Sequence, residues 1–272
     1  MPQEISVLIT HYGDVFWVKR VIESGKMSEH DFIKKIWIID QNRGDAQLLA
    51  LQEIHPKIEL VAYPIEGTGN HDHAASLDRF LLENADSIAS THLLILDSDL
   101  IIRDIDFYEK LSLASENSSA VLALEPGSFF LTHPCLMLLH TSTLKLINFK
   151  DCMSNLKVDT GRLIGVQLTK GGHLISFITP TKAYGGALGF HYLGNSAYHV
   201  TSVSIRQQPS RRVGKSNLWL SMSESWRRWI VFSRIPSYST RFGRFIFESV
   251  RVIYCLAFTL KWYLKLLFQK RT

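Results

Sequence analysis

The sequence predicts an α/β fold in which a mostly parallel sheet is flanked by helices. Four apolar segments of strand length, at residues 5–10, 35–40, 58–63 and 93–96, alternate with three segments of helical pattern. This alternation is typical of parallel sheets with helices on both faces. The four strands are continuous apolar runs, without a regular polar alternation, which indicates that both of their faces are buried.

Three helical segments separate these strands along the chain. They cover about residues 15–24, 46–54 and 74–84. Beyond residue 100 the pattern is less regular. We expect further strands and one more helix there, namely strands at residues 120–124, 135–140 and 174–178 and a helix over residues 158–169. Residues 125–134 and 185–198 are expected to be loops.

Charge divides the chain into two regions. Residues 1–204 contain 16 Lys and Arg against 23 Asp and Glu, whereas residues 205–272 contain 14 Lys and Arg against two Glu. We therefore expect a domain over residues 1–205 and a basic, aromatic-rich C-terminal region over residues 206–272. A basic region of this kind suits an anionic partner, and the membrane surface and nucleic acid are the two candidates.

The cysteines and the N-terminus indicate the cellular setting. Cys135, Cys152 and Cys255 are widely spaced and form no C-x-x-C pair, so neither a disulfide framework nor a zinc knuckle is indicated. The N-terminal segment lacks the basic and apolar regions of a signal peptide. The sequence therefore predicts a reducing, cytoplasmic location.

Two carboxylates follow the fourth strand. Residues 93–99 read Leu-Leu-Ile-Leu-Asp-Ser-Asp, and side chains at positions i and i+2 of an extended segment share one face, so Asp97 and Asp99 can converge on one point. Open α/β sheets bind ligands at the carboxyl ends of their strands. Two hard oxygen ligands there suit Mg²⁺ or Mn²⁺ carrying a diphosphate. The plainer alternative is a strand end whose aspartates cap the following turn.

Polar side chains also follow the first two strands. Thr10 and Tyr12 follow the first strand, and Asp40 ends the second. The carboxyl ends of these strands lie side by side in a doubly wound sheet, so a nucleotide can lie across them. Asp40 would accept a hydrogen bond from the base or the ribose, and Tyr12 would stack on the base. The predicted nucleotide contacts are thus Thr10, Tyr12, Asp40 and Asp97.

In their order, these motifs resemble those of family 2 glycosyltransferases, which have the Rossmann-like GT-A fold. The segments LITHYGD, IIDQNRGD, GNHDHAASLD and LLILDSDL follow one another over roughly the first 105 residues. Thr10 and Tyr12 match the family's turn after the first strand, and Asp40, Asn42 and Asp45 match the end of the second. The resemblance implies a GT-A sheet and a nucleotide-sugar donor. It also implies that the Asp-x-Asp pair holds Mn²⁺ or Mg²⁺.

The resemblance further implies a carboxylate base that deprotonates the acceptor hydroxyl in an inverting transfer. The acidic pair that the family usually carries is not evident here. Asp159 is the best candidate, with Asp151 in reserve. Asp159 can equally cap the helix that we expect to enter at Thr160.

Many GT-A enzymes add a late histidine to the metal site. The segment Phe-His-Tyr-Leu-Gly-Asn-Ser-Ala-Tyr-His offers His191 and His199. The H-x-x-G-x-S form around His191 is closer to the family's pattern, so we prefer His191 as the metal ligand. A solvated loop histidine is the alternative for both. His71 and His73 lie two positions apart near a helix start, where side chains diverge, so we expect packing or phosphate contact from them.

The C-terminal region combines basic and apolar residues. A basic run, Arg206, Arg211, Arg212 and Lys215, can close over a diphosphate or form a solvated connector. Residues 241–272 have a helical pattern with basic residues on one side and apolar residues on the other. The longest uncharged run, residues 252–260, is far short of the roughly 20 residues that span a bilayer. We therefore expect an amphipathic helix at the membrane interface, and the alternative is a helix packed on the protein's own core.

Together these features predict a metal-dependent, inverting glycosyltransferase. It would move a sugar from a nucleotide-sugar donor to a membrane-proximal glycan or lipid-linked acceptor, at the inner face of the cell membrane and without nucleic acid. Bacterial surface polysaccharide or lipopolysaccharide synthesis is the expected process. Two alternatives stay open. A sugar nucleotidyltransferase would carry a Gly-rich phosphate loop, which Thr-His-Tyr-Gly-Asp is not, and a membrane adaptor would keep the fold without catalysis.

Overall fold

The computed structural model describes part of the 272-residue chain, namely residues 3–12, 15–41, 46–64, 70–124, 128, 131–150, 160–180, 182–183 and 190–199. By its contacts the chain divides into two compact units, residues 1–181 with 191–199 and residues 182–190 with 200–272. The described part of the second unit is β9 (Lys182–Ala183) and Phe190. The groups of side chains considered below belong to the first unit.

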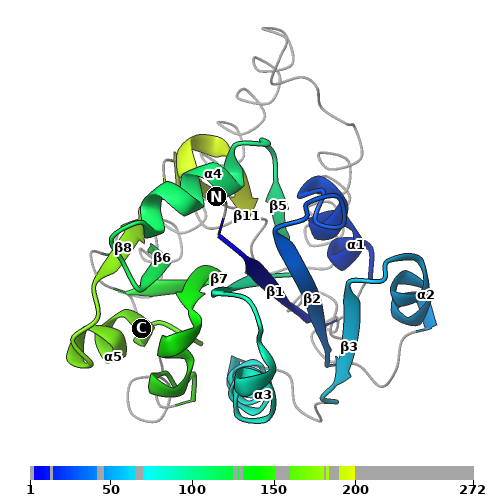
Figure 1. Ribbon diagram of the computed structural model, residues 1–272, viewed down its shortest axis with the longest axis horizontal. Helices are drawn as coiled ribbons and strands as arrows, with labels where there is room; N and C mark the ends of the chain where they lie inside the picture. The colour runs from blue at the N-terminus through cyan, green and yellow to red at the C-terminus, as the bar shows by residue number, and fades with distance from the viewer. Residues whose placement is uncertain are drawn as a thin grey trace, which may run out of the picture. The chain divides into compact units, whose positions relative to one another are not determined.

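Seven strands form the central sheet of the first unit, in the order β3-β2-β1-β4-β7-β6-β8 (Figure 1). Their bounds are β1 Ile5–His11, β2 Ile33–Asp40, β3 Ile58–Ala62, β4 His92–Asp97, β6 Ala120–Leu124, β7 Thr132–His140 and β8 Ile175–Ile178. Neighbouring strands pair in parallel except around β7, which is antiparallel to both β4 and β6. The predicted α/β fold with a mostly parallel sheet is therefore confirmed.

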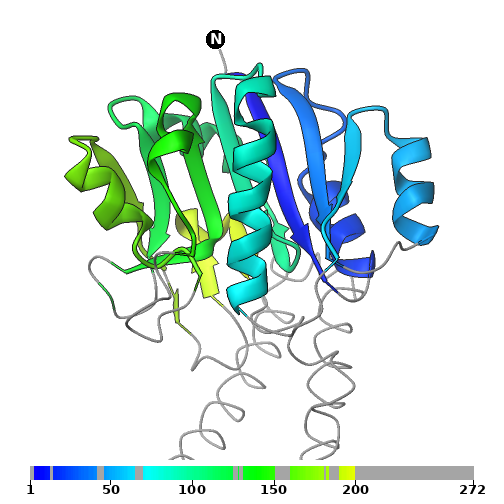
Figure 2. The same ribbon diagram turned by 90° about the horizontal axis from the view of Figure 1, so that it is seen from below.

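Helices cover both faces of this sheet. The helices are α1 Val15–Ser24, α2 Ala46–Ile54, α3 Asn70–Asn84, α4 Phe107–Ser115 and α5 Ile164–Lys170, with 3₁₀ turns η1 Ala85–Ser87, η2 Thr141–Leu146 and η3 Leu193–Asn195. Figures 1 and 2 show α3 and α5 on one face of the sheet and α1 and α4 on the other. Within the described residues, no helix is long and apolar enough to cross a membrane.

The core lies on both faces of the sheet. On one face, Phe80 of α3 packs edge-on against Trp37 of β2, with ring centroids 5.4 Å apart, and both side chains are fully buried. On the other face, α1 buries Val18, Val21 and Ile22, which recur at the spacing of an amphipathic helix. Burial on both faces is the reason that the strands are continuous apolar runs.

A second, smaller sheet corrects part of the sequence prediction. It contains β5 (Leu100–Ile102), β11 (Ala197–His199) and β10 (Phe190–Tyr192), which neighbour one another in that order. The prediction of a loop over residues 185–198 is therefore wrong for β10 and for the first residues of β11. These strands have three residues each, and β11 is held by antiparallel pairing with β5, almost 100 positions earlier in the chain. A local pattern of three residues does not reveal such a pairing.

Other boundaries also differ from the prediction. The helix expected over residues 158–169 begins in the structure at Ile164, while residues 151–159 lie outside the described part. The last three residues of the loop expected over residues 125–134 belong to β7, which begins at Thr132. The C-terminal appendage and the domain boundary near residue 205 also lie outside the described residues and stay predictions.

Candidate metal and donor site

The sheet has a topological switch point between β1 and β4. The chain adds β2 and β3 on one side of β1, and then places β4 on the other side. In open α/β sheets the crevice beyond the carboxyl ends at such a point is the usual ligand site. Parallel register places Thr10 of β1 beside Asp97 of β4, and places His11 beside Asp40 of β2. Three of the predicted nucleotide contacts thus lie on adjacent strands at one edge of the sheet.

A histidine joins the two aspartates at this edge. Asp97 ends β4, and Asp99 lies in the turn that leads into β5. Antiparallel pairing of β11 with β5 places His199 opposite Leu100, immediately after Asp99. The Nε2 atom of His199 is 3.0 Å from Oδ1 of Asp99 and 3.5 Å from Oδ2 of Asp97. One ligand atom from each of the three residues lies within 4.8 Å of the others.

The charges of these three groups stabilise one another. Burial alone would raise the pKa of Asp97, but the hydrogen bond from His199 and the charge of His73 hold it below its usual value. Burial likewise disfavours the charged form of His199, but the nearby Asp99 and Asp97 raise its pKa to about 10. His199 is therefore a cation at neutral pH when no metal is bound. Two carboxylates, one buried and one partly exposed, are stabilised at this point by a positive charge, which a divalent cation can supply.

A second histidine approaches the same point from α3. The Nε2 atom of His73 is 2.9 Å from Oγ1 of Thr10 and 4.0 Å from Oδ1 of Asp97. His73 lies in the first turn of α3, and its side chain is half-buried. The sequence predicted only packing or phosphate contact for this residue. The structure places it where it can orient Thr10 and Asp97.

No protein-family profile and no curated protein sequence matches this chain. Solved structures do resemble it. Galactosyltransferase LgtC, in complex with donor and acceptor sugar analogues, is 10% identical with a TM-score of 0.50, over 81% of this chain and 95% of that chain. The chain has the GT-A fold.

Two further solved glycosyltransferases show a weaker likeness. Mannosyltransferase PcManGT from Pyrobaculum calidifontis, in complex with GDP-Man and Mn²⁺, is 14% identical with a TM-score of 0.47, over 96% of this chain and 87% of that chain. S. aureus TarS 1–349, in complex with UDP-GlcNAc, is 16% identical with a TM-score of 0.44, over 66% of this chain. The present chain spans 59% of the length of that TarS structure.

The histidine that the structure places beside the two aspartates is His199. His191, which the sequence pattern favoured, lies in β10 and is 1% exposed, with its ring 4.8 Å from that of Tyr198. Among the described residues, it belongs to neither group of potential ligand atoms within 4.8 Å of one another. The H-x-x-G-x-S pattern around His191 could not reveal this difference, because the position of His199 depends on the pairing of β11 with β5.

The other predicted contacts lie at the same edge of the sheet. Thr10 and Asp40 are 6% and 4% exposed, respectively, and Tyr12 is partly exposed immediately after β1. Thr10 is therefore next to the Asp97 carboxylate, whereas Asp40 is one strand further away. The predicted base Asp159 and its alternative Asp151 lie outside the described residues. The basic run from Arg206 to Lys215 also lies outside them.

The residues present fit a divalent cation. Carboxylate oxygens from Asp97 and Asp99 suit Mg²⁺ or Mn²⁺, and a histidine nitrogen is compatible with Mn²⁺. Asp97 is partly exposed, with 19% of its side chain accessible, which leaves a path for a ligand from solvent. A histidine must lose its proton before it can bind a metal, so we expect metal binding here to release a proton from His199.

Proposed function

We propose that the chain is a metal-dependent glycosyltransferase that moves a sugar from a nucleotide-sugar donor to an acceptor hydroxyl. The observation that carries this proposal is the convergence of Asp97, Asp99 and His199 at the switch point of a GT-A sheet. The resemblance of the motif order to family 2 glycosyltransferases supports it. The complex of LgtC with donor and acceptor sugar analogues agrees with this choice of substrate class.

In this proposal, a bound Mn²⁺ or Mg²⁺ supplies positive charge that stabilises the diphosphate leaving group. Asp97 and Asp99 would bind this ion at the carboxyl end of β4, and His199 of β11 would be its third protein ligand. Thr10 lines the same point, and its hydroxyl is held by His73. Asp40 and Tyr12 would receive the ribose and base along the neighbouring strand end.

The acceptor half of the reaction rests on the sequence. Asp159 is our proposed base, which takes the proton of the acceptor hydroxyl as this oxygen attacks the anomeric carbon. Inversion of configuration follows from the family resemblance, and the anomeric proton coupling of the product would test it. The basic, aromatic-rich residues 206–272 support a glycan or lipid-linked acceptor at the inner face of the cell membrane.

A thermal-shift screen tests the donor site. The purified chain is heated with UDP-, GDP-, CMP- and dTDP-sugars, each with Mn²⁺ and with EDTA. We expect one nucleotide class to raise the melting temperature only with Mn²⁺, because ligands that bind the folded state stabilise it. The Asp99→Asn variant should lose this shift, whereas Asp104→Asn, which changes an exposed carboxylate just after β5, should keep it. An equal shift in EDTA, or in Asp99→Asn, would refute the metal-dependent donor site.

A sedimentation assay tests the membrane proposal separately. Full-length protein and a variant ending at residue 240 are mixed with liposomes that contain anionic lipid. We expect the full chain to sediment with the liposomes at low salt and the shortened chain to stay in solution, because basic side chains and buried apolar residues both favour the interface. Equal sedimentation of the two proteins would rule out residues 241–272 as the anchor.

A further inference from the structure

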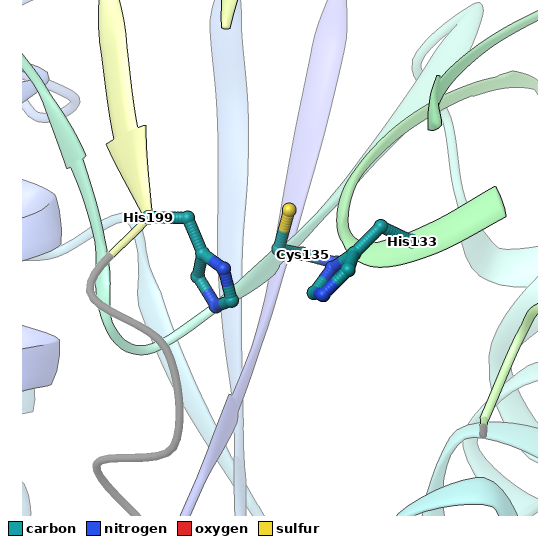
Figure 3. A group of neighbouring side chains, drawn as sticks. All are labelled: His133, Cys135 and His199. Atoms are coloured by element: carbon teal, nitrogen blue, oxygen red, sulfur yellow. The ribbon is translucent and has the colours of Figure 1, made fainter. Parts of the chain in front are cut away.

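A second group of potential metal ligands adjoins the carboxylate site. It consists of His133 and Cys135 of β7 together with His199 of β11, and Figure 3 shows the two imidazole rings on either side of Cys135. One ligand atom from each residue lies within 4.8 Å of the others. The group contains two imidazole nitrogens and one thiol, so its chemistry differs from that of the two aspartates.

Strand pairing brings this group together. His133 and Cys135 are two positions apart in β7, so their side chains emerge on the same face. Antiparallel register places Leu136 of β7 opposite Leu96 of β4, which sets Cys135 beside the end of β4 that carries Asp97. The ring of His133 then lies 4.9 Å from the ring of His199, at an angle of 65°.

The two nitrogens of His199 have different surroundings. Nε2 faces the carboxylates of Asp97 and Asp99, at 3.5 Å and 3.0 Å. Nδ1 is buried and has no hydrogen-bond partner within the described part of the chain. A buried polar atom without a partner carries a cost in free energy, and a ligand that binds it removes that cost. Nδ1 of His199 is therefore the nitrogen that can act as a ligand together with His133 and Cys135.

We propose that His133, Cys135 and His199 form a second metal site, selective for a thiophilic divalent ion such as Zn²⁺, which shares His199 with the carboxylate site. Thiolate and imidazole ligands favour Zn²⁺, whereas carboxylates favour Mg²⁺ and Mn²⁺. Zinc with three protein ligands keeps a fourth, open position. On binding, the Cys135 thiol and the protonated imidazole of His199 each release a proton to solvent, and the sulfur and the Nδ1 atom of His199 form bonds to the metal. His133 is partly exposed, whereas Cys135 and His199 are buried, so His133 is the ligand nearest to solvent.

Cobalt reports on this site directly, because a cobalt–thiolate bond produces a charge-transfer absorption band that carboxylate and imidazole ligands do not. We expect Co²⁺ to produce this band in the full-length, metal-free protein, and Zn²⁺ to remove it by displacement. The band should persist when Cys152 and Cys255 are both changed to Ser, and vanish in Cys135→Ala. In His133→Gln, we expect the affinity for Zn²⁺ to fall by about 100-fold.

The shared histidine gives a further arm of the same experiment. His199→Gln should lose the band and His191→Gln should keep it, with the melting temperature of each metal-free variant showing that it is folded. A band that survives in Cys135→Ala, or disappears when only Cys152 and Cys255 are changed, would overturn the proposal, as would unchanged Zn²⁺ affinity in His133→Gln. Asp99→Asn should keep the band, so failure of the donor site and failure of this site give different results.

Discussion

Two halves of the site, one on parallel strands and one on antiparallel strands, supply different chemistry to one point. On the parallel side, β1 and β4 provide Thr10 and Asp97, and the carboxylates suit a hard cation. On the antiparallel side, β7 of the central sheet and β11 of the smaller sheet provide imidazoles and a thiol. Among the described residues, only His199 belongs to both ligand groups. Strands β1 and β4 have seven and six residues and are almost fully buried, whereas β11 has three residues. The parallel half therefore determines where the site lies, and the short strand β11 determines that His199 is the histidine at the site.

The strongest test of this comparison removes support from the parallel half. Phe80 of α3 is fully buried against Trp37, while Leu82 of the same helix is 88% exposed. We expect Phe80→Ala to lower the free energy of unfolding by about 3–5 kcal/mol, because the truncation leaves a cavity. Leu82→Ala should change it by less than about 0.5 kcal/mol. Urea denaturation followed by circular dichroism measures both, and equal losses would mean that α3 does not support the sheet as described.

The second test addresses the short strand. We expect His199→Gln to weaken Mn²⁺ binding by about 100-fold, because the variant loses a metal ligand beside Asp99. His191→Gln is the matched control, since His191 is a buried histidine of the neighbouring strand β10 and belongs to neither ligand group among the described residues. Titration of the free Mn²⁺ signal by electron paramagnetic resonance measures the affinities. A larger loss in His191→Gln would restore the original sequence-based preference for His191.

The parallel half could be predicted from the sequence because its signals are local. The apolar run of residues 93–96 ends directly in Asp97. Such a run predicts both a buried strand and the position of its carboxyl end. The same reasoning placed Thr10 and Asp40 at the ends of β1 and β2, and the structure has all three at one edge of the sheet.

The antiparallel half could not be predicted in the same way because it depends on distant pairings. His199 reaches Asp99 through the register of β11 with β5, and Cys135 reaches the end of β4 through the register of β7. Neither register is specified by residues close to these side chains in the sequence. The wide spacing of the three cysteines leaves no C-x-x-C pair in the sequence. It gives no information about Cys135, which lies beside histidines from two different strands.

The amino end of β4 provides a contrast with its carboxyl end. His92 lies opposite His140 in the sheet, with ring centroids 5.2 Å apart. The pKa of His92 is lowered to about 4, mainly because the side chain is buried and also because of the charge of His140. The unfolded chain, with a histidine pKa near 6.5, therefore binds more protons than the folded chain between about pH 6.5 and pH 4. Stability must fall as the pH is lowered through this window.

We expect this histidine to account for about 1–2 kcal/mol of the stability lost between pH 7 and pH 5. In His92→Gln, which cannot titrate, the loss over that range should be smaller by this amount. Urea denaturation at the two pH values measures the difference between the variant and the natural chain. The same loss in both proteins would show that His92 is protonated in the folded state, and that its contact with His140 does not suppress its charge.

The smallest expected effect concerns the link between α3 and the parallel half. His73 holds the Thr10 hydroxyl at 2.9 Å and lies 4.0 Å from Asp97, so its loss should leave the fold intact but free both side chains to move. A single hydrogen bond of this kind contributes about 1 kcal/mol, so His73→Phe should weaken metal-dependent nucleotide binding by about fivefold. His55→Phe is the matched control, because His55 also contacts a hydroxyl, Ser28 at 3.1 Å, and lies in a different part of the first unit. Calorimetric titration with the nucleotide identified by the thermal-shift screen measures both. Equal affinities in the two variants would mean that β1 and β4 hold Thr10 and Asp97 in place without help from the helix.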